Sequence, residues 1–160
     1  MTARLLGAVL LSMAGALLGH NRLAAQRRRA ALLREISEGL GRMADELRVL
    51  LAPLPEIFER LRDRPFFCLL HAGWGLEPTD ALWRRAAGAQ ELTAQEREAL
   101  ASLAAVVGRY DAPRQAAEIA LKRAELTAAA ERLEAEIASR GRNYTGLGAA
   151  LGAILAVVLF

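Results

Sequence analysis

The chain has 160 residues, a formal net charge of +3 and a single cysteine, Cys68. One cysteine excludes an intramolecular disulfide, which fits a reducing compartment. All 18 acidic and 20 of the 21 basic residues fall between residues 20 and 143, so this nearly neutral segment is flanked by two uncharged, apolar ends. The middle segment is long enough for one domain with its own core.

The N-terminal run 5–19 is uncharged and rich in Leu, Ala, Gly and Val, which predicts a transmembrane anchor over residues 1–20. A cleavable signal peptide is the alternative, because the run is short and Arg4 precedes it. The arginines at 27–29 resist translocation, so we favour a retained anchor followed by a cytoplasmic segment. Contact with anionic lipid or nucleic acid is a further reading of these arginines. A topology signal explains them better beside a span, and we expect no nucleic-acid partner.

Residues 21–143 are predicted to form an all-α cytoplasmic helical bundle. Apolar residues recur at steps of three and four, which is the heptad pattern of a helix packed along a parallel or antiparallel neighbour. The seam consists of Leu33, Ile36, Leu40, Met43, Leu47, Leu50 and Leu54. Pro53 and Pro55 are expected to end this helix. Gly39 and Gly41 weaken it, and they allow a neighbour to approach closely.

Shorter helices are predicted between residues 56 and 108. One covers 56–62, a brief apolar element with Cys68 in the core follows at 66–71, and residues 77–80 open a helix that carries Leu82 and Trp83. Thr93 and Glu96 have the spacing of a capping box. The helix that they open is expected to bury Leu100, Leu103 and Val107 and to end at Gly108.

Asp111 is the predicted N-cap of the longest helix, with Pro113 in its first turn. Its apolar stripe consists of Ala116, Ile119, Leu126, Ala130, Leu133 and Ile137. This helix and the first one have similar lengths, so we expect two antiparallel arms. Disulfide trapping between cysteines placed at Leu40 and Leu126 would test that pairing.

The C-terminal residues 144–160 carry no charge and are predicted to form a second transmembrane helix, near the ~17-residue lower limit for a span. Both termini would then lie outside the cytoplasm. Gly15 and Gly19, and likewise Gly148 and Gly152, have the small-xxx-small spacing that lets membrane helices pack closely. Chance is the alternative explanation in segments so rich in glycine and alanine.

No catalytic set, metal-ligand spacing or phosphate-binding loop is evident, so we expect no enzyme activity, no metal and no cofactor. Three turns are better candidates, for contact with a partner protein: 52–56, 73–75 and 108–111. The predicted partner-binding residues are Pro53, Leu54, Pro55, Glu56, Gly108, Arg109 and Asp111. The alternative is that these prolines and glycines only separate helices.

In order and spacing, several stretches resemble the stage III sporulation protein AB family of spore-forming bacteria over nearly the full chain. They are the apolar run ending in Gly19 and His20, and the segments 52–59 (APLPEIFE), 107–115 (VGRYDAPRQ) and 144–148 (YTGLG). The chain departs from the family pattern at Tyr110, where a serine usually precedes the aspartate.

The resemblance implies a fold similar to the cytoplasmic helical modules of type II secretion platform proteins. It also implies a structural and adaptor subunit of the secretion-like complex that joins mother cell and forespore. The protein would sit in the mother-cell membrane with its bundle in the cytoplasm. The implied partners are the ATPase stage III sporulation protein AA, other subunits of the stage III sporulation A complex and the lipid bilayer; a second copy of the chain is a further candidate.

Two alternative functions stay open. One is a platform subunit of an ordinary type II-like secretion or pilus system, which neighbouring genes would distinguish. The other is a membrane-bound hydrolase or small transporter, which the absence of a catalytic set and of charged residues in the apolar runs 5–19 and 144–160 disfavours.

Overall fold

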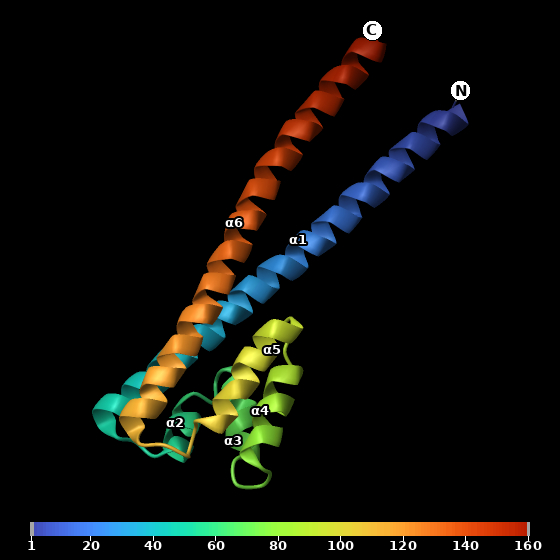
Figure 1. Ribbon diagram of the computed structural model, residues 1–160. Coiled ribbons are helices and arrows are strands. Elements are labelled where there is room, and N and C mark those ends of the chain that lie inside the picture. The colour runs from blue at the N-terminus through green and yellow to red at the C-terminus, as the bar shows by residue number, and fades with distance from the viewer. Residues whose placement is uncertain (1, 160) are drawn as a thin grey trace. The chain divides into compact units, whose positions relative to one another are not determined.

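The computed structural model describes the backbone of residues 2–159 and the side chains of residues 23–139. Its elements in order are α1 (Thr2–Asp45), the π-helix η1 (Glu46–Leu50), α2 (Leu54–Arg60), α3 (Pro65–Gly73), α4 (Thr79–Gly88), α5 (Ala94–Ala101), the 3-10 helix η2 (Ser102–Ala105) and α6 (Ala112–Leu159). Figure 1 shows this helical architecture. Between residues 2 and 159 there is no strand, so the all-α prediction is confirmed.

The chain divides into two compact units. One comprises residues 1–30 and 131–160, and the other, which we call the head unit, comprises residues 31–130. Between residues 23 and 139 no helix is long and apolar enough to cross a membrane. The predicted spans 1–20 and 144–160, with the glycine pairs predicted to pack them, lie outside the described side chains and stay predictions.

The predicted seam of α1 is confirmed as far as Leu47, since Leu33, Ile36, Leu40, Met43 and Leu47 are all buried. The prediction is wrong for Leu50, which is 62% exposed. The reason is the π-helix η1, because its wider turn rotates Leu50 away from the seam. The helix also ends before the prolines, at Leu51, which adopts a left-handed conformation with φ 50°.

Gly39 and Gly41 of α1 both allow close approach, as predicted. A Cβ on Gly39 would collide with the ring of Phe67, which α3 places against this face of α1. A Cβ on Gly41 would lie 2.9 Å from Cζ of Arg123 on α6. Since side chains at these positions would displace α3 and the arginine, the glycines determine how tightly α1 packs in the head unit.

The short helices pack in sequence, α2 on α3, α3 on α4 and α4 on α5. Phe66 meets Phe67 and Trp83 edge to face at ring-centroid distances of 5.2 and 5.6 Å, an arrangement that aromatic rings prefer. Burial of Trp83 and Leu82 confirms the predicted core face of α4. Cys68 is exposed rather than part of the core, because α3 turns Phe66, Phe67 and Leu70 inward and Cys68 outward.

The capping box of α5 is confirmed in both directions. The Glu96 amide donates to Thr93 Oγ1 at 3.4 Å, and the Thr93 amide donates to Glu96 Oε2 at 2.8 Å. Leu100, Leu103 and Val107 are buried, as the pattern predicted. Gly108 ends this region with φ +77°, a conformation that glycine adopts without strain.

Within the head unit, α1 and α6 run in opposite directions (Figure 1). Leu40 from α1 and Leu126 from α6 belong to one buried cluster, together with Ile119. This arrangement agrees with the predicted antiparallel pairing over residues 31–130. Disulfide trapping remains the solution test of the pairing.

Candidate partner-binding site

The three turns that the sequence indicated separately come together in the head unit. A Cβ on Gly108 would lie 3.7 Å from Leu54 Cδ1 and 3.9 Å from Trp74 Cη2. Leu54 belongs to the 52–56 turn and Trp74 to the 73–75 turn, where its ring stacks edge to face on Phe58 at 5.0 Å. We call the joined segments 49–56, 73–76 and 108–115 the turn cluster.

The 52–56 turn presents its prolines and glutamate to solvent. Pro53 takes an extended conformation as the N-cap of α2, and Pro55 occupies the first turn, where a missing amide hydrogen costs nothing. Leu54 is half-buried against the core. Pro53, Pro55 and Glu56 are exposed, so three of the four predicted residues here are accessible to a partner.

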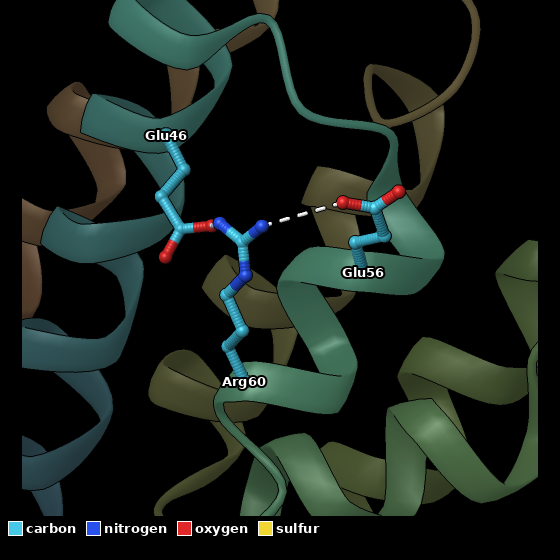
Figure 2. A network of polar contacts seen from close by, with 3 residues as sticks. All are labelled: Glu46, Glu56 and Arg60. Carbon is cyan, nitrogen blue, oxygen red and sulfur yellow. Dashed lines mark hydrogen bonds and ion pairs between the residues drawn. The ribbon is translucent and has the colours of Figure 1, made fainter.

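Arg60 fixes the position of this turn relative to η1. Figure 2 shows its guanidinium between two carboxylates, Glu46 on η1 and Glu56 on α2. Its Nη1 lies 2.9 Å from Glu46 Oε2, and its Nη2 lies 3.3 Å from Glu56 Oε2. The Glu46 carbonyl in addition accepts the amides of Leu51 and Ala52, which closes the π-turn. Glu46 therefore holds both the backbone of the turn and the link to α2.

Gln115 holds the 108–111 turn, a role that sequence reasoning missed. Gln115 is only 7% exposed. Its Oε1 accepts a hydrogen bond from the Gly108 amide at 3.0 Å, and its Nε2 donates one to the Tyr110 carbonyl. Gln115 lies one helical turn beyond Asp111, and its place in the segment 107–115 was the one signal that could have indicated it.

Asp111 occupies the predicted N-cap position, since its backbone carbonyl accepts the first helical bond, from the Gln115 amide at 3.0 Å. Its carboxylate is exposed and accepts no hydrogen bond from the start of α6 within the described residues. The side-chain cap expected from sequence is thus absent there, because Gln115 organises the turn instead. Arg109 is exposed beside it.

Exposed apolar side chains add to the turn cluster. Val49, Leu50 and Leu51 are consecutive and each more than 60% exposed. Tyr110 is 43% exposed, and the Arg114 guanidinium lies 4.0 Å from its ring centroid, a cation–π contact. The heptad pattern did not predict this exposed surface, because it assigned Leu50 to the buried seam. Consecutive exposed apolar residues are typical of protein contact surfaces.

The described side chains include no candidate metal-binding cluster. Between residues 23 and 139, no group of three or more His, Cys, Asp or Glu side chains is placed to hold a metal ion. His71 instead pairs with Glu59, Nε2 to Oε2 at 2.8 Å, and so joins α3 to α2.

A family model described as Stage III sporulation protein AB matches residues 4–160. This is not a known family of enzymes. Comparison with curated proteins and with solved structures gave no match.

Proposed function

Because the chain belongs to the stage III sporulation protein AB family, we propose that it is a structural adaptor subunit that couples a cytoplasmic ATPase to a membrane assembly between mother cell and forespore. The ATPase is stage III sporulation protein AA. The observation that carries this proposal is the turn cluster, where three turns meet and three consecutive exposed apolar residues directly precede one of them in the chain.

The proposed location is the mother-cell membrane, with the head unit in the cytoplasm and both termini outside it. The uncharged ends of the chain and the arginines at 27–29 support this topology. The lipid bilayer and other subunits of the complex would contact the ends, and a second copy of the chain is a further proposed partner. The surface of the turn cluster would remain available to the ATPase.

The proposed mechanism is mechanical. Both α1 and α6 continue without a break from the head unit toward the predicted spans, as Thr2–Asp45 and Ala112–Leu159. The packed core around Leu40 and Leu126 joins these helices to the turn cluster, and packed interiors transmit strain because they compress little. A movement of the ATPase against the turn cluster would therefore displace both helices.

The test is calorimetric titration of the ATPase into the full chain in lipid nanodiscs, with and without nucleotide. Leu50→Ser should weaken binding by about tenfold, as loss of an apolar contact residue typically does. Leu121→Ser is the matched control, because Leu121 is exposed on α6 but lies outside the turn cluster. Wild-type protein that is folded and inserted yet does not bind the ATPase would refute the proposal.

A further inference from the structure

A groove of about 280 Å³ lies between α1 and α6 within the head unit. Its floor consists of buried small residues from both helices, Gly41, Ala44 and Ala116, and its exposed edges carry Ala120, Arg48 and Arg123. Pro113, which belongs to the turn cluster, also lines the groove. Small side chains let another helix approach closely, since the distance between helix axes depends on the residues at the contact.

Only one charge in this groove lacks a counter-charge. Arg48 pairs with Asp45, Nη2 to Oδ1 at 3.4 Å, so these two charges cancel. Arg123 makes no ion pair within the described part of the chain, and its guanidinium lies across Gly41. The groove therefore has an apolar floor and one unpaired positive charge, that of Arg123. The guanidinium fits over Gly41 because glycine has no side chain there.

We propose that this groove binds an acidic amphipathic helix of the ATPase partner. A carboxylate of that helix would pair with Arg123, whose planar guanidinium suits bidentate contact, and small apolar side chains would pack on the alanine floor. The charge complementarity and the small floor select this occupant. The inference rests on the proposed function and adds to it a second contact, beside the turn cluster, with a stated chemistry.

The test compares Arg123→Gln with Arg132→Gln in the full chain in nanodiscs. Arg132 is also exposed on α6 but does not line the groove. Arg123→Gln should raise the Kd for the ATPase by about tenfold or more, because a hydrogen bond to a charged group is lost. It should also make binding less sensitive to salt, since one charge pair no longer contributes. Arg132→Gln should change neither quantity, and Arg123→Lys should restore part of the affinity.

Gly41→Ala provides a second variant that leaves the arginine in the sequence. Its methyl group would lie 2.9 Å from Arg123 Cζ and displace the guanidinium, so the Kd should rise while helical circular dichroism shows an intact fold. If Arg123→Gln binds the ATPase like wild type, the groove proposal is wrong and the proposed function stands. If the wild-type chain does not bind the ATPase, the proposed function is wrong, and so is the proposal that an ATPase helix occupies the groove. If Arg123→Gln loses binding to phosphatidylglycerol vesicles while its affinity for the ATPase is unchanged, the proposal is overturned, and lipid is the ligand of the groove.

Discussion

Leu51 is the one non-glycine residue between residues 2 and 159 with a positive φ. A side chain in this conformation crowds its own backbone and costs roughly 1–2 kcal/mol. Leu51 is also 69% exposed, so removing its side chain sacrifices little burial. We therefore expect Leu51→Gly to raise the free energy of unfolding by about 1 kcal/mol.

Urea denaturation of the full chain in detergent would measure this gain. Leu50→Gly is the control, because Leu50 lies in η1 and has no positive φ. Glycine within a helix lowers stability, so this substitution should lower the free energy of unfolding. Equal destabilisation by both substitutions would show that Leu51 is not strained in solution.

Gln115 is the second residue whose effect on stability should exceed that of its neighbours. Gln115→Ala leaves the Gly108 amide and the Tyr110 carbonyl without their partner, and should lower the free energy of unfolding by about 1–3 kcal/mol. Gln95→Ala on the exposed face of α5 should change it by less than about 0.5 kcal/mol. The same urea titrations compare the two variants, and equal effects would contradict the role assigned to Gln115.

At the scale of elements, Arg60 links η1 to α2 (Figure 2). Exposed ion pairs contribute about 0.2–1 kcal/mol each, so Arg60→Met should lower stability by up to about 2 kcal/mol at low salt. At 1 M NaCl the difference from wild type should nearly vanish, because salt screens exposed charges.

Arg62→Met is the matched control for Arg60. Arg62 makes a single exposed ion pair, with Glu59 on α2, and within the described residues no ion pair joins it to η1. Arg62→Met should therefore lower the free energy of unfolding by less than Arg60→Met does. Hydrogen exchange of the Leu51 and Ala52 amides should become faster in Arg60→Met alone. Faster exchange in both variants would mean that Arg60 does not hold the π-turn.

The elements that sequence predicted well are those set by local chemistry. Thr93 and Glu96 satisfy each other's backbone amides three residues apart, so the start of α5 follows from spacing. The seam of α1 follows from periodicity until the π-turn changes the period at Glu46. Nothing in the heptad pattern signals that change, and the exposure of Leu50 could not be predicted.

The candidate site was predicted only in its parts. Pro53, Gly108 and Trp74 each marked a turn by residue type. The contact of Gly108 with Leu54 and Trp74 depends on how the helices that carry these turns pack. The groove over Gly41 likewise joins residues some 80 positions apart in the sequence, Gly41 and Arg123. Long-range contacts of this kind arise from the fold as a whole and have no local signature.

At the scale of the whole molecule, the head unit has its own buried core, and the uncharged residues lie at the two ends of the chain. The proposed function requires these ends to cross a membrane with the head unit on the cytoplasmic side. Cys68 provides a natural reporter of that topology, because it is the single cysteine and is exposed on α3.

We predict that a membrane-impermeant maleimide does not label Cys68 in intact protoplasts that express the chain, and labels it after detergent is added. The introduced cysteine of Thr2→Cys, in a Cys68→Ser background, should be labelled already in intact protoplasts. The reason is that the positive-inside rule places the N-terminus outside the cytoplasm. The two variants share one reagent and one membrane, so each controls for the other. Labelling of Cys68 in intact protoplasts would place the turn cluster outside the cytoplasm, out of reach of an ATPase, and the adaptor function would then be untenable.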